Sequence, residues 1–439
     1  MTLDGAHHEV VVIGGGQAGL SMSHRLLARD IDHVVLERER IGFAWREQRW
    51  DTFCLVTPNW QCDLPGFAYP GDDPDGFMAR DEIVRYLEEY ARSFDPPLVE
   101  GVEATRLRAR GRCFAVTTTA GTLTADQVVL ATGPYQVPNV PRVAERLPAD
   151  VTQIHSVAYR NAGQLPEGAV LVVGTGQSGC QIAEDLHLAG RAVHLAVGTA
   201  PRVARRYRGR DVVGWLDEMG YYAKPIDSFA DADAMRFRAN HYVTGRDGGR
   251  DIDLRAFARD GMVLHGRLTG IADGRVTFAG DLAVNLDAAD RVNEGIKDSV
   301  DAHIEANGID APTEPRYVPV WTPGEAVGEL DVRAAGISAV VWCTGFGRDH
   351  RWIELPIFDG RGYPTHRRGV SSVPGIYLLG LPWQHTWGSG RFCGVGADAE
   401  HLAGQIARLG AGGFEVAWLS GTTTSTFPVD DWQPTRTVA

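Results

Sequence analysis

The sequence predicts an α/β protein in which one strand–turn–helix unit occurs twice. An apolar run at residues 8–13 leads directly into Gly-x-Gly-x-x-Gly and then into a helical pattern. A run at 169–173 does the same about 160 residues later. Further apolar runs at 128–133 and 375–380 also end in glycine turns. Together these observations predict two Rossmann-like dinucleotide-binding domains, with the second inserted into the first.

Length, composition and charge define the broad class of protein. The 439 residues suffice for two or three domains of about 100–200 residues each, and the 44% hydrophobic content is typical of soluble globular proteins. The formal net charge of -13 has the wrong sign for attraction to nucleic acid or anionic lipid, so we expect neither partner. No apolar run approaches the roughly 20 residues that span a bilayer, and the N-terminus lacks a signal-peptide pattern. We therefore expect a cytoplasmic enzyme that acts on a small molecule.

The six cysteines are scattered along the chain and include no Cys-x-x-Cys pair. This distribution argues against a disulfide-stapled secreted protein and against a zinc ribbon. We expect no metal site.

The first glycine turn has the features of a dinucleotide site. Its glycines permit a tight turn and let a pyrophosphate approach the backbone N–H groups at the helix N-terminus. A second strand, at 33–36, leads into an acidic residue about 20 residues after the last glycine, where a carboxylate accepts hydrogen bonds from an adenosine ribose. The residues assigned to this site are Gly14, Gly16, Gln17, Ala18, Gly19, Glu37 and Arg38.

The second glycine turn repeats the motif but differs after its second strand, at 192–197. The motif residues are Gly174, Gly176, Gln177, Ser178 and Gly179. No acid ends the strand, and five arginines follow within nine residues: Arg202, Arg205, Arg206, Arg208 and Arg210. This change favours a ribose 2′-phosphate, and hence NADP(H) over NAD(H), with Arg205 and Arg206 preferred among the five. The two ribose chemistries indicate a permanent FAD at the first site and an exchangeable NADPH at the second.

The remaining patterns complete the expected fold. Strands are expected at 104–108, 113–118, 121–124, within 261–280 and at 339–346, and helices at 282–298, 300–307 and 394–408. The last helix would place its N-terminus near the N1/C2=O edge of a reduced flavin.

The most economical topology makes the FAD-binding domain discontinuous. We assign residues 1–160 to its first part, 161–334 to the NADP-binding domain, and 335–439 to its second part with a C-terminal tail after Trp418. Ligands are then expected at the carboxyl ends of parallel strands, with the reaction at the domain interface.

Two further stretches, ATGPYQVP at 131–138 and CTGF at 343–346, together with the two glycine units, resemble the flavin-containing monooxygenases. The stretches QRWDTFCLVTPNWQCDLPGF, HYVTGRDGGRDIDLR and LPWQHTWGSGRF resemble more closely a bacterial branch of flavin-dependent oxidoreductases often found beside a nitrilase. The broader family has the pattern Phe-x-Gly-x-x-x-His-x-x-x-Tyr/Phe before the NADP unit. Here His155 and Tyr159 keep its second half, whereas Ala149 and Val151 replace the Phe and the Gly.

This resemblance implies a mechanism. NADPH reduces FAD, and the reduced flavin reacts with O₂ to form a C4a-(hydro)peroxyflavin. This species oxygenates a soft nucleophile such as an amine or a sulfide. N-hydroxylation is favoured, since the nitrilase association points to nitrogen chemistry. Such an enzyme needs hydrogen bonds to both cofactors and a dry cavity, but no metal.

The resemblance also implies particular site residues. Asn59 corresponds to an asparagine near the reacting flavin, with a turn-forming Pro-Asn as the alternative. Trp45 resembles a tryptophan beside FAD, with a plain core aromatic as the alternative. The other assigned cofactor contacts are Thr132, Gly133, Gly380 and Arg391.

Three other functions stay open. A Baeyer–Villiger oxygenase needs a cation near the flavin, for which Arg46, Arg49 or Arg391 qualifies. A disulfide reductase needs a redox cysteine pair, and Cys54 and Cys62 are separated by seven residues. A nucleotide-sensing protein without turnover is the third. The substrate loops are expected within 207–250, and a homo-oligomer is left open.

Overall fold

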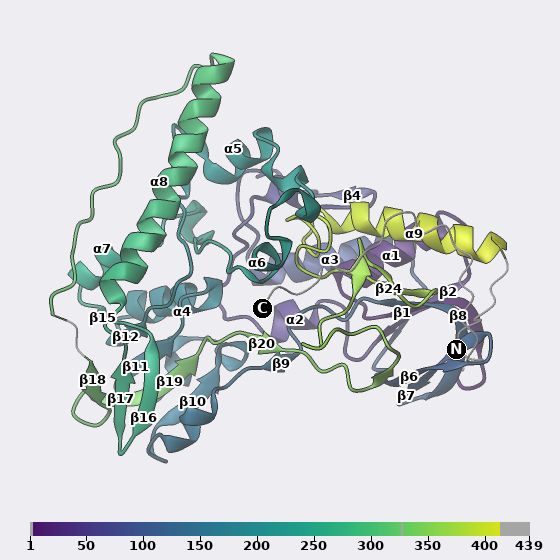
Figure 1. The fold of residues 1–439 in the computed structure, drawn as a ribbon, viewed down its shortest axis with the longest axis horizontal. Coiled ribbons are helices and arrows are strands. Elements are labelled where there is room, and N and C mark those ends of the chain that lie inside the picture. The colour runs from purple at the N-terminus through teal and green to yellow at the C-terminus, as the bar shows by residue number, and fades with distance from the viewer. Residues whose placement is uncertain (1–2, 326–327, 413–439) are drawn as a thin grey trace.

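The computed structural model describes residues 3–325 and 328–412, and it contains two parallel sheets with helices on them (Figure 1). The C-terminal tail expected after Trp418 lies outside the described residues. Within these ranges, no helix combines the length and the hydropathy needed to cross a membrane.

The first sheet has the parallel core β24-β8-β1-β2-β5. Its strands are β1 (His7–Ile13), β2 (His33–Glu37), β5 (Leu98–Glu100), β8 (Gly121–Leu130) and β24 (Ile376–Leu378). The first half of β8 also pairs with an antiparallel meander of β6 (Ala104–Arg110) and β7 (Cys113–Thr118). The meander strands expected from the sequence are therefore confirmed, with the third continuing through β8.

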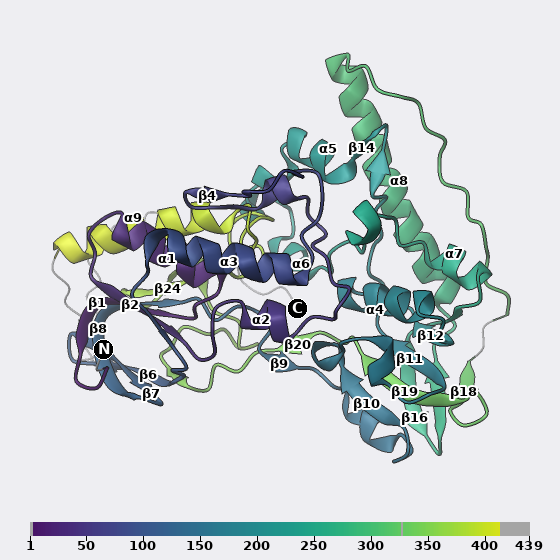
Figure 2. The ribbon, with the colours of Figure 1, turned by 180° about the vertical axis from the view of Figure 1, so that it is seen from behind.

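The two faces of this sheet are covered differently, as the alternation along β1 requires. Val10 and Val12 pack against the helices α1 (Gln17–Leu27), α3 (Arg80–Phe94) and α9 (Val395–Gly412). Val11 and Ile13 pack toward β6 and β7. Figures 1 and 2 show the three helices on one side of the sheet and the meander on the other.

The second sheet has the order β10-β19-β11-β12-β15, and every pairing is parallel. Its strands are β10 (Thr152–His155), β19 (Ile337–Trp342), β11 (Ala169–Val173), β12 (Val193–Ala196) and β15 (Val263–His265). One face packs against α4 (Gln177–Leu188), α7 (Leu254–Arg259) and α8 (Leu282–Asn307). The other packs against a small antiparallel sheet of β16 (Leu268–Ala272), β17 (Arg275–Phe278) and β18 (Glu329–Asp331).

Sheet membership differs from the domain boundaries expected at 160/161 and 334/335. β10 precedes the first boundary and β19 follows the second, yet both pair within the second sheet. β19 is apolar on both faces, with Val341 packed on the α4 side and Val340 on the other. Such a strand suits an interior position of a sheet that is covered on both sides. The second sheet thus takes strands from beyond both expected positions, and the domain boundaries themselves stay predictions.

The chain passes between the two sheets twice, and a short two-stranded ribbon joins the two passages. β9 (Val137–Pro138) pairs antiparallel with β20 (Phe346–Gly347). Beside them, the backbone N–H of Asn139 donates to the Gly345 carbonyl at 3.0 Å, and the Asn139 side chain donates to the Thr344 carbonyl at 3.1 Å. The two crossings are therefore hydrogen-bonded to each other.

The two polar helices expected at 282–298 and 300–307 are one continuous helix, α8. Its buried residues recur at helical spacing throughout, including Leu286, Asn293, Val300 and Ile304, so nothing breaks it before Gly308. In both views α8 lies at the edge of the molecule, and the chain returns alongside it in extended form (Figures 1 and 2).

The remaining elements are short. They are α2 (Phe43–Glu47), β3 (Asp63–Leu64), β4 (Phe67–Ala68), β13 (Arg206–Tyr207), β14 (Arg210–Asp211), α5 (Val212–Glu218), α6 (Ala232–Phe237), β21 (Ile353–Glu354), β22 (His366–Arg367) and β23 (Val370–Ser371). Turns of 3-10 helix lie at Asn59–Gln61, Arg142–Arg146, Ser156–Ala158, Ala162–Gln164, Tyr221–Ala223, Ile226–Ser228 and Arg246–Gly248.

A buried imidazole makes stability depend on pH. His265 is 3% exposed and stacks on Phe278 with 4.2 Å between ring centroids, and burial lowers its pKa to about 4. Below its ordinary pKa of about 6.5, the unfolded chain binds a proton that the folded protein does not bind until about pH 4. We expect the free energy of unfolding to fall as pH falls from 6.5 to 4, with a contribution from His265 of up to about 1.4 kcal/mol per pH unit.

Denaturant unfolding across this pH interval measures the effect. His265→Phe removes one titrating group and should make the dependence shallower, because His241 and His366, whose pKa burial also lowers to about 4, still contribute. His7→Gln, at an exposed position, should leave the dependence as in the wild type. Identical slopes in all three proteins would contradict the assignment.

Candidate active site

The first glycine turn forms a cradle, by which we mean the backbone from Gly14 to Gly19. A Cβ on Gly14, where φ is +111°, would lie 2.4 Å from the Ala131 carbonyl oxygen. A Cβ on Gly19 would lie 1.8 Å from the Gly14 carbonyl oxygen. A Cβ on Gly16 would meet no atom within 4 Å, so this glycine alone borders open space at the N-terminus of α1. The outer two glycines are thus required by packing, and Gly16 leaves room for a phosphate.

Glu37 lies where the sequence placed it, at the end of β2 beside this cradle. Its two carboxylate oxygens accept the backbone N–H groups of Gly15 at 2.6 Å and Glu39 at 3.0 Å. These bonds fix the carboxylate, and its remaining lone pairs suit a ribose diol. Arg38 is exposed and borders an open cavity of about 630 Å³, lined also by Phe43 and Arg160.

The loop between β24 and α9 closes over the start of α1. Gln17 Nε2 donates to the Gly390 carbonyl at 2.8 Å. Gly380 has φ +89°, and a Cβ there would lie 2.9 Å from that of Ala18, which is itself buried. The structure therefore brings Gln17, Ala18 and Gly380 together, with Ala18 in a packing role and Arg391 one residue beyond Gly390.

Thr132 and Gly133 lie just beyond the carboxyl end of β8. They line a small cavity with Gln136, Leu378 and Leu381. Gln136 Nε2 donates to Thr132 Oγ1 at 3.0 Å. The two residues thus stand at the strand ends, in reach of a ligand bound along the first cradle.

The second cradle, from Gly174 to Gly179, has the same construction. Gly174 has φ +103°, and a Cβ there would lie 2.7 Å from the Cys343 carbonyl oxygen. A Cβ on Gly179 would lie 1.9 Å from the Gly174 carbonyl oxygen, while Gly176 again meets nothing within 4 Å. Gln177 donates to the Val243 carbonyl, and Ser178 is partly buried in the first turn of α4.

Arg205 lies deep in the fold and is unsuited to a phosphate. Its side chain donates to Asp211 Oδ1 at 2.5 Å and to the Val56 carbonyl at 2.7 Å, and it lies 4.6 Å from the Phe77 ring centroid. The residue is 1% exposed, so these protein contacts do not favour Arg205 as the ligand of the ribose 2′-phosphate, and that assignment stays a prediction.

Three of the other four arginines of this stretch are paired with carboxylates, and one is not. Arg202, Arg208 and Arg210 form ion pairs with Asp290, Asp301 and Glu218 at 2.7, 2.7 and 2.6 Å. Arg206 is exposed, and within the described residues its side chain has a single hydrogen bond, to the Gly248 carbonyl at 3.4 Å. Arg206 is therefore the candidate that the structure leaves available for phosphate.

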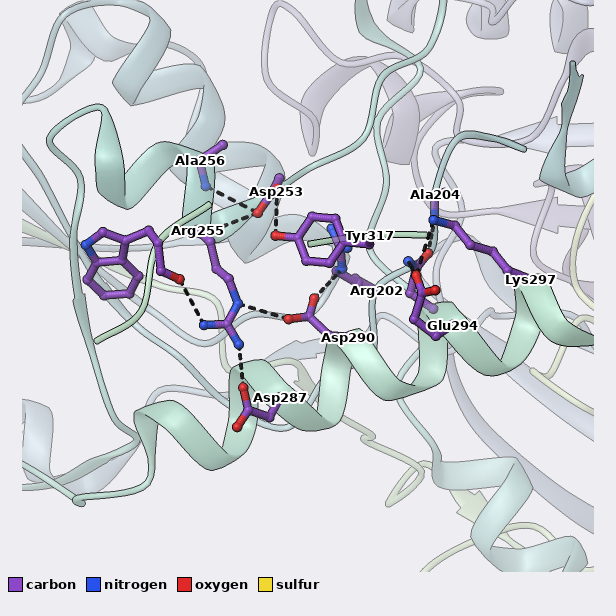
Figure 3. Close-up of polar contacts among 12 residues, drawn as sticks. Arg202, Ala204, Asp253, Arg255, Ala256, Asp287, Asp290, Glu294, Lys297 and Tyr317 are labelled. Carbon is purple, nitrogen blue, oxygen red and sulfur yellow. Dashed lines mark hydrogen bonds and ion pairs between the residues drawn. The ribbon is translucent and has the colours of Figure 1, made fainter. Parts of the chain in front are cut away.

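An ion-pair network ties the stretch to α8 (Figure 3). Asp290 on α8 forms an ion pair with Arg202, with 2.7 Å between Oδ1 and Nε, and it accepts a hydrogen bond from Arg255 Nε at 2.9 Å; both arginines are buried. Arg255 also donates to Asp287 at 2.5 Å. Arg202 lies 3.9 Å from the ring centroid of Tyr317, so the network reaches the extended segment after α8. Arg202 and Arg255 thus connect α8 to neighbouring segments of the second domain.

Asn59 does not face an open site. Its Nδ2 donates to the Asp73 carbonyl at 2.9 Å, its Oδ1 accepts the Met78 N–H at 2.7 Å, and the residue is 3% exposed. These bonds hold the loop at 73–78 and differ from the turn-forming Pro-Asn considered as the alternative. The role of Asn59 near the reacting flavin stays a prediction.

Two groups of aromatic side chains lie on segments of the two domains. Trp45, on α2, stacks on Phe392 with 5.9 Å between ring centroids and lies 5.9 Å from Phe53. Trp387, in the loop before α9, lies 4.3 Å from Tyr222 of the inserted domain. We call these five rings the aromatic cluster. The sequence did not single out Phe53 and Phe392, although both lie in stretches that carried the resemblance.

A segment of the inserted domain covers the loop before α9. Tyr221–Ala223 and Ile226–Ser228 are its two turns. The Ile226 N–H donates to the His385 carbonyl at 2.6 Å. The rings of Phe229 and Trp383 pack edge to face, with 5.4 Å between their centroids. The expected substrate loop within 207–250 therefore reaches the flavin-binding domain.

These features define a two-domain oxidoreductase with one dinucleotide cradle in each domain. A family model described as pyridine nucleotide-disulphide oxidoreductase matches residues 11–239. An uncharacterized CzcO-like oxidoreductase from Geobacillus kaustophilus is 34% identical over 402 residues, which are 91% of this chain and 98% of the relative. The chain therefore belongs to the pyridine nucleotide-disulphide oxidoreductase family.

Two solved structures share the fold. A flavin-containing monooxygenase from Stenotrophomonas maltophilia has a TM-score of 0.63 at 20% identity, covering 92% of this chain and 99% of that one. An ornithine N-hydroxylase from Kutzneria sp. 744 has a TM-score of 0.60 at 18% identity, with the same coverage of 92% and 99%. The predicted fold class and the resemblance to flavin-containing monooxygenases are confirmed, and the protein is an oxidoreductase.

The three glycines of the first cradle should respond differently to a methyl group. Gly19→Ala forces a side chain against the Gly14 carbonyl and should destabilise the fold by about 3 kcal/mol or more. Gly16→Ala meets no protein atom, so its apoprotein should keep the melting temperature of the wild-type apoprotein, whereas the variant should lose bound flavin. Thermal denaturation and flavin absorbance per chain measure both effects. A Gly16→Ala protein that retains full flavin would contradict the role of this opening.

The network in Figure 3 predicts a large stability effect from one carboxylate. Asp290→Asn leaves the buried Arg202 and Arg255 without their shared partner and should cost about 3–5 kcal/mol in denaturant unfolding. Asp298→Asn is the matched control on the same helix, because this side chain is 70% exposed and should change stability by less than about 0.5 kcal/mol. Equal losses in the two variants would argue against the network.

Proposed function

We propose that this protein is an FAD- and NADPH-dependent monooxygenase of a small nitrogen- or sulfur-containing molecule, with N-hydroxylation as the favoured reaction. The observation that carries the proposal is the pairing of two open cradles, at Gly16 and Gly176, with the aromatic cluster where the domains meet. One cradle suits a resident cofactor and the other an exchangeable hydride donor. The aromatic cluster suits a reaction that must exclude water.

Each site fits its cofactor through residues of this chain. The open backbone at Gly16 and the carboxylate of Glu37 suit the pyrophosphate and ribose of FAD. Gly176 suits the pyrophosphate of NADPH, and the exposed Arg206 suits its 2′-phosphate. When bound, the flavin supplies a centre that accepts two electrons and reacts with O₂.

The overall reaction balances without a further reagent. One NADPH, one proton and one O₂ are consumed, one oxygen atom enters the substrate, and the other leaves as water. An amine R–NH₂ gives R–NHOH, and a sulfide gives a sulfoxide. The chain itself binds and orients the cofactors, and its aromatic cluster keeps water from the reacting atoms.

The comparisons support this reading of the site. The Stenotrophomonas maltophilia protein is a flavin-containing monooxygenase by name, and the Kutzneria protein is an ornithine N-hydroxylase. A cytoplasmic location and a small-molecule partner stay predictions.

Baeyer–Villiger oxygenation of a ketone is the second candidate, because two arginines near the aromatic cluster have no carboxylate partner among the described residues. These are Arg49 and Arg391, whereas Arg46 pairs with Glu88 at 2.6 Å. Conversion of a ketone to an ester would decide for this reaction. The disulfide reductase gains no support, since all six cysteines are free and burial raises the pKa of the Cys62 thiol to about 12.

Rapid-reaction absorbance of the holoenzyme tests the proposal. The protein is reduced anaerobically with NADPH and then mixed with oxygenated buffer. We expect a transient near-ultraviolet absorbance before oxidised flavin returns, and faster decay when a substrate amine or sulfide is present. Direct return to oxidised flavin, without a transient and without product from a panel of amines and sulfides, would contradict it and favour a reductase.

A further inference from the structure

We infer that the substrate carries a carboxylate, and that Arg49 and Arg391 bind it beside the aromatic cluster. The inference rests on the proposed function, because it names the substrate class of the same site. Its basis is a pair of arginines whose surroundings are aromatic and contain no acid within the described residues.

Arg49 lies among three aromatic rings. Its guanidinium carbon is 5.1 Å from the Trp45 ring centroid, 5.6 Å from that of Phe53 and 5.9 Å from that of Tyr135. Its hydrogen bond goes to the neighbouring Gln48 carbonyl at 2.8 Å, which leaves most of its donors unused. Burial lowers the pKa of Arg49, as expected for a cation that has lost water without gaining an anion.

Arg391 has a similar environment, in the loop between β24 and α9. Its guanidinium carbon lies 3.8 Å from the Trp387 ring centroid. The side chain donates to the Trp387 carbonyl and to Asn240 Oδ1, the latter at 3.0 Å. Both acceptors are neutral, and burial lowers the pKa of Arg391 as well.

Other arginines in the neighbourhood are neutralised by the protein. Arg46, three residues before Arg49, pairs with Glu88 at 2.6 Å, and Arg205 pairs with Asp211 at 2.5 Å. A half-buried cation without an anion costs free energy. Because the fold pairs the neighbouring arginines with carboxylates but not Arg49 and Arg391, the positive charge of these two side chains is available to a ligand.

The two cations belong to one site. Trp45, under Arg49, stacks on Phe392, which directly follows Arg391. The Tyr135 ring centroid lies 5.9 Å from the guanidinium carbon of Arg49, and Tyr135 raises the pKa of both arginines against the effect of burial. An anion placed between them would gain charge-assisted hydrogen bonds, and the planar guanidinium favours a carboxylate. The surrounding rings suit an apolar substrate body, so the substrate class is an apolar carboxylic acid with an oxidisable nitrogen or sulfur.

Binding to the oxidised holoenzyme tests this without turnover. The probes are (phenylthio)acetate and its neutral amide (phenylthio)acetamide, which differ in charge but not in shape, and isothermal titration calorimetry measures both affinities. We expect the wild type to bind the acid at least about tenfold more tightly than the amide. Arg49→Gln and Arg391→Gln should each abolish most of that preference while leaving the affinity for the amide within about twofold.

Three further variants make the result specific. Arg46→Gln is the matched control, because Arg46 lies on the same segment but has Glu88 as its partner; it should keep the wild-type preference. Arg49→Lys and Arg391→Lys retain the charge and should restore part of the preference for the acid, which a purely structural role would not require.

Equal affinity of the wild type for acid and amide would overturn the inference. So would Arg49→Gln and Arg391→Gln proteins that lose bound flavin yet keep the preference for the acid, because the arginines would then serve the flavin. The proposed function fails separately, if no amine or sulfide is oxygenated by a wild-type enzyme that still prefers the acid.

Discussion

The whole structure depends on a contact that only glycine permits, and it occurs once in each domain. In the first domain a Cβ at Gly19 would lie 1.8 Å from the Gly14 carbonyl oxygen, and in the second a Cβ at Gly179 would lie 1.9 Å from the Gly174 carbonyl oxygen. Without side chains at these positions, α1 and α4 begin directly at the ends of β1 and β11. The free N–H groups of each helix then lie at the carboxyl edge of a parallel sheet, where the positive end of the helix favours phosphate.

Arginine has two distinct roles in this chain. Arg202, Arg255 and Arg205 are buried and form ion pairs with aspartates, and they attach the inserted segments to α8 and to each other. Arg49 and Arg391 instead face rings and neutral acceptors. The first group contributes to the rigidity of the second domain, and the second group leaves positive charge beside the aromatic cluster. Composition alone does not distinguish these two groups, because the role of each arginine depends on whether its partner is a carboxylate or an aromatic ring.

Local pattern was sufficient for much of the fold. The strand–glycine–helix units, the meander and α9 depend on contacts within about 30 residues, and the sequence predicts all of them. Glu37 was found for the same reason. The contacts that hold Arg205 and Asn59 were not predicted, because partners such as the Val56 and Asp73 carbonyls are backbone groups that carry no signal in the sequence. The position of β19 between β10 and β11 was missed because a strand between two apolar faces looks the same in either domain.

The ribbon of β9 and β20 has a consequence for motion. The chain passes twice between the domains, and both passages are tied together there, so the two domains share one narrow hinge. Such a hinge allows a swing about one axis and resists separation. A swing would break the contacts of residues 50–56 with the second domain, such as the Arg205–Val56 and Thr52–Asp185 hydrogen bonds, together with the Ile226–His385 hydrogen bond. It would leave both cradles intact, because each lies within its own domain. A bound flavin could thus stay in place through each opening that admits substrate and exchanges the nicotinamide nucleotide.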